Sequence, residues 1–200
     1  MNWQTLREQP LDFVRPEALA ACLGEGPEQW REQVLGHPRF RERLTHLMLA
    51  FHELQPLEQV PPPDAATLAV LQLPALRFAR LARQCGAIWH AATLAKEVRG
   101  EVLQQLRERL GQGVYEQALA HRELAGAADL LREPSALLAA IDQDGAACLS
   151  QWLQAQPEAL RAWLQLRFEL PSAKPVGPAV NPAIVGVAAR ALLAPEEVAP

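Results

Sequence analysis

The stretch PALRFARLARQCGAIWHAATLAKEVR, residues 74–99, determines the fold class more strongly than any other part of the chain. Apolar residues recur in it at steps of three and four, the spacing of one helix face. They are Phe78, Leu81, Ala82, Cys85, Ile88, Trp89 and Ala92, and the other side carries Leu76, Ala79, Ala87 and Leu94. A helix that is apolar nearly all round belongs inside a fold. The pattern therefore predicts one long central helix over about 74–99.

The segments on either side carry the signals of further helices. Proline suits the first turn of a helix, because the N–H that it lacks would be unpaired there. Five prolines each precede a segment whose apolar residues recur at helical spacing: Pro27, Pro38, Pro134, Pro157 and Pro182. Two polar residues, Asp64 and Asn181, are placed to cap the helices that follow them. Leu and Ala, which favour helices, dominate the apolar residues. We therefore expect an all-α fold, a compact single domain of roughly eight to ten helices around the central one.

Proline content also suggests where the chain divides. The segment PSAKPVGPAVN, residues 171–181, has the composition of a stiff linker. This predicts a helical core domain over 1–170, a proline-rich linker over 171–181, and a short C-terminal helix with a tail over 182–200. We expect the linker to be more mobile than the core, and the last helix to pack weakly.

Composition narrows the class of protein. The 200 residues carry a formal net charge of −4, whereas nucleic-acid and anionic-membrane binding favour a basic surface. The start, MNWQTLREQP, lacks the basic and apolar regions of a signal peptide. No apolar run is long enough to span a membrane. The three cysteines are far apart in sequence, which is typical of a reduced cytosolic protein with buried thiols.

Residues that often carry chemistry form no motif. Cys85 and His90 are five residues apart, so on one helix they point about 140° apart and cannot share a metal or form a dyad. Cys85 is expected to be a small buried hydrophobe and His90 a packed histidine. His121 has Glu123 two positions on, which would point elsewhere on a helix. The sequence DQDG, residues 142–145, lacks the later ligands of a calcium loop. We expect no metal ion, no cofactor and no small-molecule substrate.

Two other function classes stay open at this point. One is an α-helical enzyme whose site is assembled from distant residues such as His90 and His121. The other is a helix-turn-helix regulator formed by LRERLGQGVYEQALAHREL, residues 106–124. Its second helix would present Glu116, Gln117 and Glu123, which suits a helical hairpin better than a DNA-reading helix.

The stretch HPRFRERL, residues 37–44, contains a local conflict. Arg39, Arg41 and Arg43 crowd the start of a helix that Pro38 is expected to open. Positive charge there opposes the helix dipole, and Arg39 and Arg43 repel each other across one turn. Such conflicts occur most often at functional sites. The stretch is either a solvated basic face or a surface that docks against an acidic partner.

Four segments resemble a known family: LARQCGAIWHAATLAKEV, EVLQQL, YEQALAHREL and GAACLSQWLQAQPEALRAWLQLRFELP. Together they are similar to the SctK family, the accessory adaptors of the type III secretion sorting platform, best over residues 71–171. The resemblance implies a cytoplasmic protein without enzymatic activity, peripheral to the inner-membrane base of the secretion apparatus. It also implies two partners, the forkhead-associated-like cytoplasmic domain of the inner-membrane ring protein and the pod protein of the platform. It offers no binding motif that can be transferred residue by residue.

Overall fold

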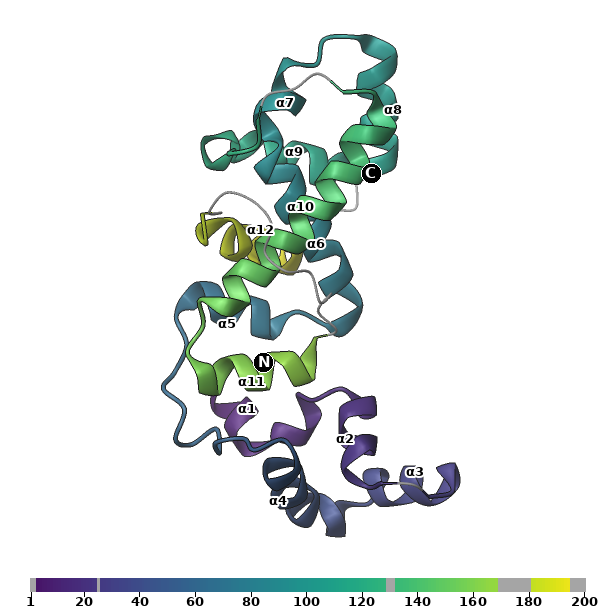
Figure 1. Ribbon diagram of the computed structural model, residues 1–200, viewed down its shortest axis with the longest axis vertical. Helices are drawn as coiled ribbons and strands as arrows, with labels where there is room; N and C mark the ends of the chain where they lie inside the picture. The colour runs from purple at the N-terminus through teal and green to yellow at the C-terminus, as the bar shows by residue number, and fades with distance from the viewer. Residues whose placement is uncertain (1–2, 25, 129–131, 169–180, 195–200) are drawn as a thin grey trace. The chain divides into compact units, whose positions relative to one another are not determined.

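The structure of the protein is a computed structural model that describes residues 3–24, 26–128, 132–168 and 181–194 (Figure 1). In these ranges every regular element is a helix, twelve α and three 3₁₀, and none is a strand. The all-α fold class is confirmed. The helices outnumber the eight to ten expected, because several segments that read as one helix are broken in two.

Two compact units contain these helices. One unit comprises Met1–Pro63 and Gln156–Glu169, and the other comprises Asp64–Ala155 and Leu170–Pro200. The division expected from the sequence, a core domain over 1–170 followed by a linker, stays a prediction. The linker expected over 171–181 lies outside the described residues except for Asn181, as does the tail after 194, so their mobility stays a prediction.

Two long helices form the centre of the second unit. α6 (Ala75–Trp89) and α10 (Pro134–Gln154) lie side by side and make its most extensive helix contact (Figure 1). They approach closely at two glycines: a Cβ on Gly86 would lie 1.9 Å from the Ile141 carbonyl oxygen, and one on Gly145 would lie 1.9 Å from that of Ala82. α6 also contacts α9 (Gln112–Ala120) and α12 (Ala183–Leu193). The predicted central helix is therefore present.

The predicted length of that helix is wrong. α6 ends at Trp89, and α7 (Ala91–Lys96) begins after His90. The carbonyl of Trp89 accepts the N–H groups of Gly126 and Ala127, each at 3.1 Å, from a distant loop. Because that acceptor is turned towards the loop, the helix is interrupted at His90. Among the residues that the structure describes, the longest helix is instead α10, with 21 residues.

The last helix packs tightly, contrary to the expectation from its position beside a linker. The helix α12 lies against α5 (Ala65–Gln72) and α6. Four of its side chains are fully buried: Ile184, Val185, Ala188 and Ala189. Gly186 permits the close approach, since a Cβ there would lie 2.6 Å from the Cβ of Ala66. As expected, Asn181 caps the start, with its Oδ1 3.0 Å from the Ala183 N–H. Asp64 likewise accepts the Thr67 N–H at 2.7 Å at the start of α5.

The remaining helices of this unit form a second apolar cluster. α8 (Gly100–Leu110) and α9 pack on each other and on α7 and the first half of α10. η3 (Arg122–Leu124) follows α9. Leu106 and Leu110 of α8 and Tyr115 and Ala118 of α9 are buried together. The two helices are thus a hairpin that faces its own core.

The first unit is joined from two distant parts of the sequence. Its N-terminal part holds six short helices: α1 (Trp3–Glu8), η1 (Pro10–Asp12), α2 (Pro16–Cys22), α3 (Glu28–Gly36), η2 (Pro38–Phe40) and α4 (Arg41–Phe51). α11 (Glu158–Arg167) completes it. Trp163 donates its Nε1–H to the Gln55 carbonyl at 2.9 Å, and Arg167 donates to the Phe13 carbonyl at 3.0 Å. Trp163 is buried, as is Trp152 in α10.

Candidate docking surface

The three arginines Arg39, Arg41 and Arg43 have different environments in the structure. Pro38 opens η2 rather than α4, and α4 begins at Arg41. Arg41 places its Nη2 2.6 Å from Asp12 Oδ1, so its charge is balanced within the same unit. Arg39 and Arg43 are exposed. Of the three arginines, Arg39 and Arg43 are therefore the more exposed to solvent.

An exposed apolar row, which the sequence analysis missed, stands beside the two arginines. Phe40, Leu47 and Phe51 are 42%, 39% and 55% exposed. Leu47 and Phe51 are one turn apart on the same face of α4, and Phe40 is the residue that directly precedes this helix. Leu44 and Met48 occupy the neighbouring buried face, where α4 packs on α2 and η1. α4 therefore has more apolar positions than its own core contact covers, and that excess was the available signal.

Histidines hold both ends of this row. The rings of His37 and Phe40 have centroids 5.4 Å apart, and those of Phe51 and His52 are 4.9 Å apart in an edge-on arrangement. A ring nitrogen of His52 lies 3.2 Å from the Ala18 carbonyl oxygen, and His37 Nδ1 accepts the Arg39 N–H at 3.2 Å. The two phenylalanine rings are thus positioned by neighbours that are themselves anchored.

The charges around the row are unequal on its two sides. Arg43 lies one turn before Leu47, on the same side of α4. Glu42, the one acidic residue in the sequence of α4, is turned about 140° away from Leu47. We call the set Phe40, Leu47, Phe51, Arg39 and Arg43 the α4 face. Single exposed apolar side chains are ordinary, but a contiguous row with a polar edge is typical of a protein-binding surface.

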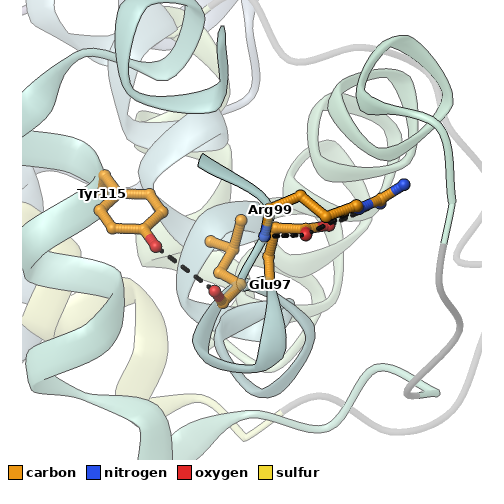
Figure 2. Close-up of polar contacts among 4 residues, drawn as sticks. Glu97, Arg99 and Tyr115 are labelled. Carbon is orange, nitrogen blue, oxygen red and sulfur yellow. Dashed lines mark hydrogen bonds and ion pairs between the residues drawn. The ribbon is translucent and has the colours of Figure 1, made fainter. Parts of the chain in front are cut away.

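The second unit presents one large apolar side chain on a closed turn. Val98 is 84% exposed and lies between α7 and α8. Glu97 Oε1 accepts from the Arg99 backbone N–H and Nε, each at 2.9 Å, and Oε2 lies 2.7 Å from Arg99 Nη2 (Figure 2). These bonds, those from the Arg99 side chain first, lower the pKa of Glu97 from 4.5 to about 2. The clamp holds the turn that displays Val98.

Tyr115 forms a hydrogen bond with the end of α7, just before this turn. Its hydroxyl donates to the Leu94 carbonyl at 3.3 Å, in the last turn of α7 (Figure 2). The Arg107 guanidinium lies over the Tyr115 ring, 5.2 Å from its centre. The end of α7 is therefore fixed to the α8–α9 hairpin, and the Val98 turn projects from a braced position.

The buried histidine of the second unit has a carboxylate partner within that unit. His90 is buried, and its Nε2 lies 2.7 Å from Asp144 Oδ2 on α10. The expectation of a packed histidine is confirmed, although the sequence did not identify Asp144, which is 54 positions away. Cys85 is fully buried, as expected, and burial raises the pKa of its thiol well above the ordinary value. Burial also raises the pKa of Cys148 to about 12.

One expectation about His121 is wrong. The chain leaves the α-helix at His121 and enters η3, so Glu123 turns back and its Oε1 lies 3.4 Å from His121 Nδ1. His90 and His121 thus have different carboxylate partners. The acidic pair of DQDG lies within helix α10, where Asp142 accepts from Arg83 at 2.8 and 2.9 Å.

Across residues 3–24, 26–128, 132–168 and 181–194, no three His, Cys, Asp or Glu side chains lie close enough to hold a metal ion. None of the helices in those ranges is both long and apolar enough to cross a membrane. A shallow, open hollow at the start of α10 has a polar lining that includes Glu108, Arg109 and Glu133.

Comparison with known proteins gives one kind of relative. The chain is 38% identical over 104 residues to the nodulation protein NolU of Rhizobium fredii, and equally to NolU of Sinorhizobium fredii (strain NBRC 101917 / NGR234). The match covers 52% of this chain and 47% of each relative, so it spans about half the length of these proteins. No protein-family model matches, and no solved structure matches. Membership of the SctK family therefore stays a prediction.

Proposed function

We propose that this protein is a non-enzymatic structural adaptor of the type III secretion sorting platform. It would bridge the forkhead-associated-like cytoplasmic domain of the inner-membrane ring protein to the pod protein, in the cytoplasm at the base of the apparatus. The observation that carries the proposal is the α4 face, a contiguous apolar row with a basic edge on an all-helical protein. The sequence resemblance to the SctK family names the two partners.

Bridging two proteins requires two separate binding surfaces. The first unit offers the α4 face, and the second offers the braced Val98 turn. Because the two surfaces belong to different units, one partner can bind each without competing for the same side chains. The similarity to the nodulation protein NolU supports relatedness to a bacterial protein of a host-associated process, in the coarse sense that this name conveys.

The test is reconstitution from purified components. The protein is mixed with the ring protein's cytoplasmic domain, with the pod protein, and with both, and each mixture is resolved by size-exclusion chromatography. We expect co-elution with each partner and a ternary complex with both. Elution of this protein alone from every mixture would overturn the adaptor function.

A further inference from the structure

We propose that the α4 face binds an amphipathic helix that carries acidic residues along one edge. This inference rests on the proposed adaptor function, because it names the chemistry of one partner's binding segment. Three features of the face carry it: the length of its apolar row, the charge beside that row, and the way its side chains are held.

The shape of the row fits a helix. Phe40 directly precedes α4 and Phe51 is its last residue, so the row extends along the whole helix, which is about 16 Å or three turns long. The row is narrow, since Leu47 and Phe51 fall within about 40° of one another around α4. Helices pack by setting such a ridge into the groove between a partner's side chains. A partner helix would pack against the row through apolar side chains at its positions i, i+3 or i+4, and i+7.

The charges beside the row select an acidic partner. Arg39 and Arg43 are exposed, whereas Arg41 is already paired with Asp12 and Glu42 points away. The face is therefore locally basic on a chain whose net charge is −4. Guanidinium groups form strong, directed hydrogen bonds with carboxylates. Glutamates or aspartates along one edge of the partner helix would meet these two arginines.

The face is also preformed. His37 and His52 position the phenylalanine rings, and Leu44 and Met48 anchor α4 in the core of its own unit. Binding then requires little ordering of this surface, which lowers its entropic cost. A membrane surface is the weaker occupant, because lipid-bound helices present a broad apolar face with basic residues along its polar side. The α4 row is too narrow for that role.

The probe is a synthetic peptide of about five helical turns, with leucines at the apolar positions i, i+3 or i+4, and i+7 and glutamates along one edge. A matched peptide carries lysines in place of the glutamates. Binding to the full chain is measured by fluorescence anisotropy at about 50 and about 300 mM salt. We expect the glutamate peptide to bind about tenfold more tightly than the lysine peptide, with the difference shrinking at the higher salt.

Variants of the full chain locate the binding. The double variant Arg39→Glu with Arg43→Glu should reverse the preference, so that the lysine peptide binds more tightly. Leu47→Ala with Phe51→Ala should weaken both peptides. Gln105→Ala, at an exposed position of α8 on the other unit, is the control and should leave both affinities unchanged. All altered side chains are exposed or half-exposed, and circular dichroism confirms that each variant folds.

Failure of this inference can be told apart from failure of the adaptor function. If the two peptides bind equally, or the charge-reversed variant keeps the original preference, the inference is overturned even where platform proteins co-elute. If the peptide preference reverses as expected but neither platform protein binds, the adaptor function alone is overturned. A dimer in light scattering, or binding to phosphatidylserine vesicles, that the Leu47→Ala and Phe51→Ala variant abolishes would assign the face to another occupant and overturn the inference.

Discussion

Gly86 and Gly145 show how single residues decide the centre of the second unit. Each lies where α6 and α10 approach so closely that a methyl group would overlap a backbone carbonyl of the other helix. A flexible side chain can move away from such an overlap, but a helix backbone cannot without separating the pair.

We predict that Gly86→Ala destabilises the protein strongly, by about 3 kcal/mol or more, because overpacking against backbone forces the helices apart. Chemical denaturation measures the free energy of unfolding. Gly113→Ala in α9 is the control, since nothing lies within 4 Å of its added Cβ. It should be neutral or stabilising, by up to about 1 kcal/mol. Equal effects at the two glycines would contradict the close approach of α6 and α10.

Glu97 predicts a pH dependence of stability. Its pKa in the folded protein is about 2, below its ordinary value of 4.5. The lowered pKa means that its charged form is favoured in the folded state. Its contribution to stability is therefore present above pH 4.5 and is lost as the pH falls towards 2.

Glu97→Gln should remove this part of the pH profile, which urea unfolding at intervals between pH 6 and pH 2 would measure. Arg99→Ala should have a smaller effect in the same direction, because it removes the side-chain donors and leaves the backbone N–H of residue 99 in place. Val98→Ala keeps both partners and should retain the wild-type profile. If Glu97→Gln and wild type lose stability in parallel over this range, the clamp does not lower the carboxylate pKa.

The buried thiols give a chemical prediction. Burial raises the pKa of Cys22, Cys85 and Cys148, and all three are free and buried. Because the thiolate is the reactive form, none should react appreciably with iodoacetamide at pH 8 in the folded protein. Mass spectrometry should show three modified cysteines after denaturation. Rapid modification of Cys85 before unfolding would contradict its position in the α6 core.

At the scale of elements, α12 is the clearest departure from expectation. Its position after a proline-rich segment predicted weak packing, yet its apolar face is buried against α5 and α6. The Arg77 guanidinium on α6 donates to the Leu192 carbonyl near its end. A helix with this much buried surface contributes to the core of its unit rather than trailing from it.

Ile184→Ala should therefore cost about 2–5 kcal/mol, the range for deleting a fully buried aliphatic side chain. Val187→Ala, at a half-buried position on the same helix, is the matched control and should cost less. Thermal and denaturant unfolding measure both. A loss below about 1 kcal/mol for Ile184→Ala would restore the expectation of a weakly packed helix.

At the scale of the whole molecule, the chain divides into two units, each with a buried core of its own. A core substitution should therefore act mainly on the unit that contains it. Leu164→Ala removes a fully buried side chain of α11 in the first unit, and Ile184→Ala does so in the second. Differential scanning calorimetry should resolve two transitions, of which each variant lowers a different one. A single transition lowered equally by both variants would show that the units unfold together.

The basic stretch shows how far sequence reasoning reached towards the site. The crowding of Arg39, Arg41 and Arg43 is visible in the sequence, and the docking surface that it predicts stays a prediction. Which of the three can meet a partner depends on Asp12, which lies 29 positions before Arg41. The sequence alone did not predict that Phe40, Leu47 and Phe51 are exposed, because an apolar residue is expected to be buried unless the structure shows otherwise.

Local properties of the sequence determined the helical class, the caps at Asp64 and Asn181, and the burial of α6, since each depends on residues within a few turns. Only the tertiary structure decided where the long helix breaks, because the loop that engages the Trp89 carbonyl is distant in sequence. The same holds for the pairing of His90 with Asp144 and for the joining of α11 to the N-terminal helices. These features depend on partners brought together by packing, and periodicity along one segment carries no information about them.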